Sequence, residues 1–100
     1  MNPRLLLAIL TELSETYPEA FSLLSFGRTI VIDKSREKEV LAVFKKFGTW
    51  TDFFQQNVSP ILVDAGFSIV EKHDEDLSPS ETAYKLPDDF DVNALRNAIK

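Results

Sequence analysis

The sequence predicts one α+β domain, spanning residues 1–100. Apolar residues recur at helical spacing over residues 3–16. Residues 29–32 are β-branched, and residues 67–71 and 82–86 form two further extended segments between turn signals. A hydrophobic fraction of 44%, with eight phenylalanines and no cysteine, supplies a core that needs no disulfide.

The first helix is expected over residues 3–16. Asn2 suits the N-cap position and Pro3 the first helical position, where a missing N–H has no consequence. Leucines at positions 6, 10 and 13 build the apolar face, and Pro18 ends the pattern. The strand at residues 29–32 follows.

Two more helices are expected in the middle of the chain. Ser35 is a candidate cap for the second, whose apolar face holds Val40, Leu41, Phe44 and Phe47 before a stop at Gly48. The third begins at the capping-box spacing of residues 49–52 and carries Trp50, Phe53, Phe54 and Val58. Pro60 interrupts this helix. Ser59 and Pro60 then predict a new short helix that ends at Gly66.

The C-terminal third predicts a hairpin and a last helix. The strands at residues 67–71 and 82–86 enclose a polar, acidic loop at residues 73–80. Asp91 is a candidate cap for a short helix that carries Val92, Leu95 and Ile99.

This order of elements is that of a winged helix: a three-helix core, a small antiparallel sheet, a long acidic wing and a short C-terminal helix. Gly66 supplies the turn from helix to wing, and Phe67 anchors it in the core. We expect Trp50 and Phe67 to share one core with Leu6, Leu10, Val40 and Phe44.

The charge is uneven along the chain. The net charge is −5, and an acidic average repels phosphate. Residues 28–46 nevertheless hold six basic and three acidic side chains, whereas residues 71–91 hold eight acidic and two basic ones. A basic region therefore precedes an acidic wing.

Part of the chain resembles the DNA-binding domain of heat shock factors. Residues 27–33 are similar to that family's strand after its first helix. The run into its recognition helix is matched by Glu39, Val40, Leu41, Phe44, Lys46, Trp50, Thr51, Phe53 and Gln56, and Gly66-Phe67 is similar to the dipeptide that closes it. The resemblance implies a winged-helix domain that binds DNA and regulates transcription. Gln55 stands where the family has a base-reading arginine, and the residues around Ser59-Pro60 are additional.

The sequence predicts a non-enzymatic chain without a cofactor or small-molecule substrate. It has a single histidine, His73, no G-x-S-x-G motif, and three widely separated glycines that form no phosphate loop. His73 beside acidic residues lacks the spacing of a metal site. No apolar run approaches membrane length, so we expect no membrane association and an intracellular location, cytoplasmic or nuclear.

Two kinds of partner remain open. For duplex DNA, Arg28, Lys45 and Lys46 are the expected phosphate contacts, and Thr51, Gln55 and Gln56 the residues that face the groove. The alternative is a winged-helix module for protein interaction or self-association that binds no nucleic acid. In it the basic region and the acidic wing suit heterologous contacts, including head-to-tail self-association.

Overall fold

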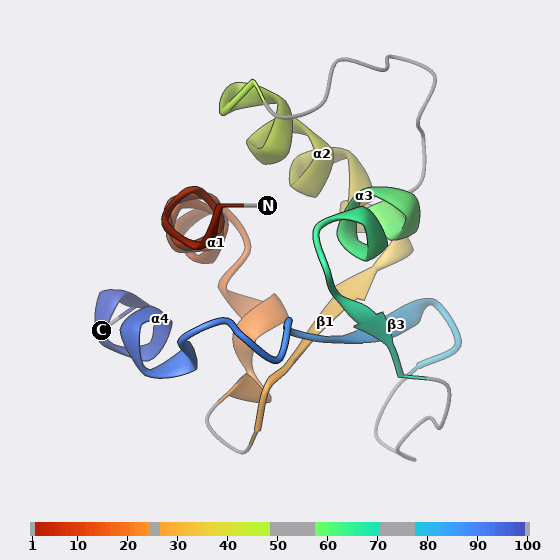
Figure 1. Ribbon diagram of the computed structural model, residues 1–100. Coiled ribbons are helices and arrows are strands. Elements are labelled where there is room, and N and C mark those ends of the chain that lie inside the picture. The colour runs from red at the N-terminus through yellow and green to blue at the C-terminus, as the bar shows by residue number, and fades with distance from the viewer. Residues whose placement is uncertain (1, 25–26, 49–57, 71–77, 100) are drawn as a thin grey trace.

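A computed structural model describes residues 2–24, 27–48, 58–70 and 78–99. Over this part of the chain it is an α+β protein with four α-helices and a three-stranded antiparallel sheet (Figure 1). In chain order the elements are α1 (Pro3–Thr16), η1 (Pro18–Phe21), β1 (Thr29–Asp33), η3 (Lys34–Arg36), α2 (Glu37–Lys46), α3 (Val58–Asp64), β2 (Ser68–Ile69), β3 (Glu81–Lys85) and α4 (Val92–Ile99).

The first and last helices begin as the sequence predicts. Asn2 Oδ1 accepts from the Arg4 backbone N–H at 2.9 Å, and Pro3 occupies the first helical position. Asp91 Oδ1 accepts from the backbone N–H groups of Asn93 and Ala94, at 3.0 and 3.2 Å. Each cap satisfies backbone donors that the first turn leaves without a helical partner.

The start of α2 corrects the sequence prediction. Asp33, and not Ser35, is the cap, and it caps the 3-10 turn η3 that precedes α2: its Oδ1 accepts from the Ser35 backbone N–H at 2.9 Å and from the Ser35 hydroxyl at 3.0 Å. The N-cap position of α2 itself, Arg36, makes no side-chain cap bond. The short 3-10 turn η3 then leads into α2. A carboxylate that accepts two hydrogen bonds outcompetes a hydroxyl two residues later, so the helical region starts earlier than predicted.

The ends of α2 and α3 each use a glycine. Gly48 (φ +68°) follows α2, and its N–H donates to the Lys45 carbonyl at 2.9 Å. Gly66 (φ +103°) follows α3 in a Schellman arrangement, in which the Phe67 N–H donates to the Leu62 carbonyl at 2.9 Å. The helix α3 includes Val58 and Ser59, so the prediction that Ser59 caps it is wrong.

The strand order in the sheet is β1-β3-β2. Ile30 pairs with Tyr84 across β1 and β3, and Tyr84 also pairs with Ile69 across β2. The pairing of β2 with β3 is confirmed, although β2 covers only Ser68–Ile69 among the described residues 67–70 of the predicted strand. Pro87 follows β3, where the sequence places its end.

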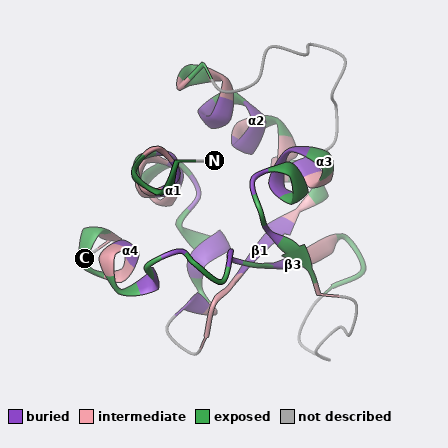
Figure 2. Ribbon diagram, viewed as in Figure 1, coloured by how far each residue is buried: buried purple, intermediate pink, exposed green. Residues whose placement is uncertain are grey.

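One hydrophobic core draws on all four helices and the sheet. Five of the six predicted core residues lie in it, namely Leu6, Leu10, Val40, Phe44 and Phe67, while Trp50 falls outside the described residues. Figure 2 shows buried segments on α2, α3 and β1. The apolar residues predicted for the last helix also contribute, since Val92 and Leu95 are buried and Ile99 packs at the edge.

Only the end of the predicted wing loop lies in the described part of the chain. Ser80 is hydrogen-bonded to the body of the molecule: its Oγ donates to Asp33 Oδ2 at 3.1 Å, and its carbonyl accepts from the Lys34 N–H at 3.0 Å. The residue that precedes β3 is thus hydrogen-bonded to the junction between β1 and α2. Residues 71–77 lie outside the described residues.

Candidate nucleic-acid interface

Two of the predicted phosphate-binding residues, Lys45 and Lys46, form the last turn of α2. Cations are favoured there because the helix dipole places partial negative charge at a C-terminus. The Lys46 ammonium forms an ion pair with Glu12 Oε1 of α1, although its side chain remains 65% exposed. Lys46 is therefore accessible but partly neutralised by its neighbour.

The third predicted contact, Arg28, is used inside the protein. Its Nη2 donates to the Pro87 carbonyl and to the Phe90 carbonyl, the latter at 2.7 Å. This half-buried guanidinium joins the start of β1 to the segment between β3 and α4. Figure 1 places the start of β1 and the end of α2 at opposite sides of the molecule, so the structure does not bring Arg28 together with the two lysines.

The predicted groove-facing residues, Thr51, Gln55 and Gln56, lie outside the described residues. The segment that contains them connects α2 to α3, so it follows Lys45 and Lys46 directly along the chain. Their assignment stays a prediction.

Arg36 and Arg96 also make internal contacts that the sequence did not indicate. The Arg36 guanidinium stacks on the Tyr17 ring, 4.1 Å from its centroid, and its Nη2 donates to Glu39 Oε2 at 2.7 Å. The bond to Glu39 raises the pKa of Arg36. Arg96 Nη2 donates to the carbonyls of Leu24 and Gly27, at 2.8 and 3.1 Å.

These arginine contacts reduce the free positive charge of the basic region. Arg28 and Arg36 account for two of its six cations, and both are engaged with acceptors of the same chain. No local signal identifies such contacts: Arg28 and Arg96 find acceptors 59 to 72 residues away in sequence. Only the tertiary fold brings these groups together.

The junction at Asp33 carries a perturbed carboxylate. The hydrogen bonds from the Ser35 backbone N–H and hydroxyl, followed by that from Ser80, hold the pKa of Asp33 below the ordinary value of an aspartate. Donors that stabilise the ionised form have this effect. Because the donors are those of a helix cap and the end of the hairpin, this perturbation has a structural explanation.

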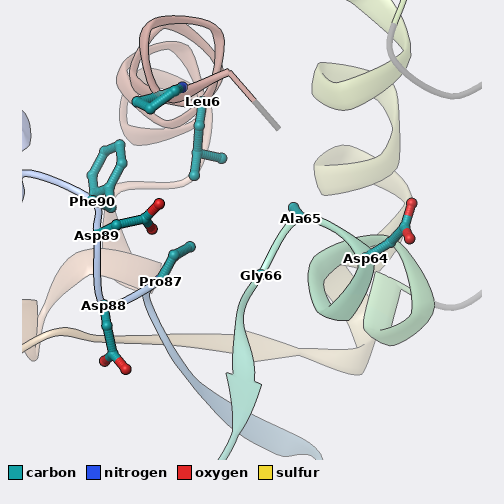
Figure 3. A pocket seen from close by; sticks show the side chains of 9 residues that line it. Leu6, Asp64, Ala65, Gly66, Pro87, Asp88, Asp89 and Phe90 are labelled. Carbon is teal, nitrogen blue, oxygen red and sulfur yellow. The ribbon is translucent and has the colours of Figure 1, made fainter.

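A cleft of about 350 Å³ lies between the start of α1, the end of α3 and the segment after β3. Leu6, Pro87 and Phe90 supply apolar lining (Figure 3). The carboxylates of Asp64 and Asp88 point away from each other, so they do not converge on one point. Within the described ranges, no group of three or more acidic, histidine or cysteine side chains is placed to hold a metal ion.

The helices in the described part of the chain include none that is long and apolar enough to cross a membrane. Comparisons of the chain with protein-family models, curated proteins and solved structures gave no match.

Proposed function

We propose that this chain is a non-enzymatic winged-helix module that binds duplex DNA. The observation that carries the proposal is the topology. A strand after the first helix pairs with the second strand of a C-terminal hairpin, in the sheet order β1-β3-β2, and the helices pack over one core. The resemblance of residues 27–56 to the DNA-binding domain of heat shock factors supports the same ligand.

In this proposal the DNA surface lies around the end of α2 and the segment that follows it. Lys45 and Lys46 hold phosphates, while Thr51, Gln55 and Gln56 face the major groove, where glutamine can bond to both edge positions of adenine. Arg28 contributes less to phosphate binding than the sequence predicts, because its guanidinium is hydrogen-bonded to backbone carbonyls.

The test is a titration against random duplex DNA at low and moderate salt. Two phosphate contacts give a slope of about −2 in a plot of log affinity against log salt, since each contact contributes about −0.9. Changing both Lys45 and Lys46 to Ala should weaken binding to every sequence alike. Lys85→Ala, which removes one positive charge from the C-terminal end of β3, is the control and should leave binding nearly unchanged.

Variants at Gln55 and Gln56 distinguish recognition of a base sequence from electrostatic attraction to any DNA. Replacing both by Ala should alter the preference among sequences more than the affinity for random DNA, because base contacts specify and phosphate contacts position. Absence of binding at low salt, where attraction is strongest, would rule out the DNA proposal.

A specific observation favours the alternative, a winged-helix module for protein interaction. Arg28 is bonded within the chain and Lys46 is paired with Glu12, so the cations available to phosphate are few while the net charge remains −5. If DNA does not bind, the same surface and the acidic wing become candidate protein contacts. Charge reversal at Lys45, Lys46 and Glu75 should then abolish association with the partner.

A further inference from the structure

The outer face of α1 forms an open groove between α2 and α4, with a volume of about 610 Å³. Figure 1 shows α1 end-on, with these two helices on either side of it. Leu7 and Phe47 are half-buried in the groove, and Ala8 and Ala98 are exposed there. The lining is therefore mainly apolar, and no other described element covers it.

Four residues of this groove form one stripe along α1: Arg4, Ala8, Thr11 and Glu15. Their spacing of four, three and four residues keeps them on one side of the helix. The two ends of the stripe carry opposite charges, and both charged side chains belong to exposed residues. Neither Arg4 nor Glu15 takes part in an ion pair within the described ranges.

The positions of these two charges do not stabilise the helix itself. Arg4 lies in the first turn and Glu15 in the last turn, and α1 has no acidic residue in its first turn and no basic residue in its last. A helix dipole favours the opposite arrangement, so both charges are mildly unfavourable within one chain. A contact outside the chain would account for them.

We propose that this stripe is the interface for a second copy of the chain, with the two α1 helices packed antiparallel across a two-fold axis. If the axis passes midway between Ala8 and Thr11, Arg4 of each copy faces Glu15 of the other. A two-fold interface uses the same patch on both copies, so this single choice of register satisfies both pairs at once.

The rest of the groove fits the same register. Ala8 and Thr11 meet at the centre, where small side chains let two helices approach closely. The Thr11 hydroxyl already donates to the Leu7 carbonyl at 2.7 Å, so its burial leaves no free donor. Glu12 keeps its ion pair with Lys46 of its own chain. Leu7 and Phe47 gain apolar cover, which supplies attraction besides the charges.

The charge pattern selects a second copy over an unrelated protein. An acidic or a basic partner would match one end of the stripe and be repelled at the other, whereas a reversed copy matches both. This interface differs from a head-to-tail contact between basic region and acidic wing, because it closes at two copies. The two proposals share Lys46, which lines the groove and is also an expected phosphate contact. Neither Arg4 nor Glu15 belongs to the DNA surface, so variants at these two positions test dimerisation without removing a residue of the DNA proposal.

Sedimentation equilibrium on the full chain, from micromolar to millimolar concentration, tests the proposal. The unmodified chain should show a monomer–dimer equilibrium that weakens as salt rises. Arg4→Glu and Glu15→Arg should each weaken dimerisation roughly tenfold or more, because each reversal creates two like-charge contacts per dimer. Both variants should keep their thermal stability, since each reversal agrees with the helix dipole.

Mixing the two variants gives the sharper result. The Arg4→Glu chain carries two acidic charges on the stripe and the Glu15→Arg chain two basic ones, so they should form a heterodimer while each alone is monomeric. Asp64→Arg, an equivalent reversal of an exposed acid outside the groove, is the matched control and should dimerise normally. A monomeric unmodified chain at millimolar concentration, or a mixture that fails to associate, overturns the proposal and leaves the groove to another partner or to none.

Discussion

At the scale of single residues, the arginines act mainly as internal donors. Arg28 and Arg96 each donate to two backbone carbonyls outside the α-helices and strands. The Leu24 and Pro87 carbonyls each accept a backbone N–H as well. A guanidinium has five N–H groups in a rigid fork, so it can bridge two carbonyls that lysine could not serve as well. These bonds hold the segment between β3 and α4, and α4 itself, against Leu24, Gly27 and Arg28, which precede β1.

Replacing Arg28 by Met tests this role, because the apolar stem remains while the donors are lost. The free energy of unfolding should fall by about 1–3 kcal/mol, since the Pro87 and Phe90 carbonyls lose a partner in a half-buried position. Urea denaturation measures the change. Lys38→Met, at an exposed position, should stay within about 0.5 kcal/mol. Unchanged stability together with lost DNA binding would return Arg28 to the DNA surface.

The same residues show what the sequence could not predict about the candidate site. The sequence shows a basic region, and Lys45 and Lys46 of that region do lie together in the last turn of α2. Whether a cation is free depends on its tertiary partners: Glu12 reaches Lys46 from another helix, and Arg28 finds carbonyls some sixty residues away. Local sequence patterns carry no information on such partners.

At the scale of elements, local signals predicted most helix boundaries. The bounds of α1 agree with the prediction, because a cap and a proline mark its start and Pro18 follows its end. The start of the helical region formed by η3 and α2 was mispredicted because Asp33 and Ser35 are both good caps and only the folded chain shows which accepts. Among the described residues 67–70 of the predicted strand, β2 covers Ser68 and Ile69, and the Val70 N–H also donates to the Ala83 carbonyl of β3.

The Asp33 cap predicts a dependence of stability on pH. Its folded pKa is lowered, so its stabilising effect is present above the pKa of the unfolded chain and is lost as pH falls through the folded value. Melting temperature, followed by circular dichroism, should therefore drop below about pH 4. Asp33→Ala should melt lower at neutral pH and show a shallower drop in acid. Equal acid sensitivity of the two proteins would assign the effect to other carboxylates.

At the scale of the whole molecule, the predictions that concern the hydrophobic core are the ones that the structure confirms. The α+β class and five of the six predicted core residues followed from periodicity alone, because burial demands apolar residues at regular spacing. The core also joins the ends of the chain, since α4 packs on α1 and extends the same hydrophobic cluster. The C-terminal helix is thus an integral part of the fold.

This integration predicts how α4 responds to a single truncation. Leu95 is fully buried, so Leu95→Ala should lower the free energy of unfolding by about 2–5 kcal/mol, the lost transfer energy plus a cavity. Asn97→Ala, at an exposed position on the same helix, controls for helix propensity and should change little. Unfolding of Leu95→Ala should remain a single transition by fluorescence and circular dichroism, because α4 shares its contacts with α1. A separate early transition of low amplitude would mean that α4 melts on its own. In that case α4 would not belong to the cooperative core of the protein.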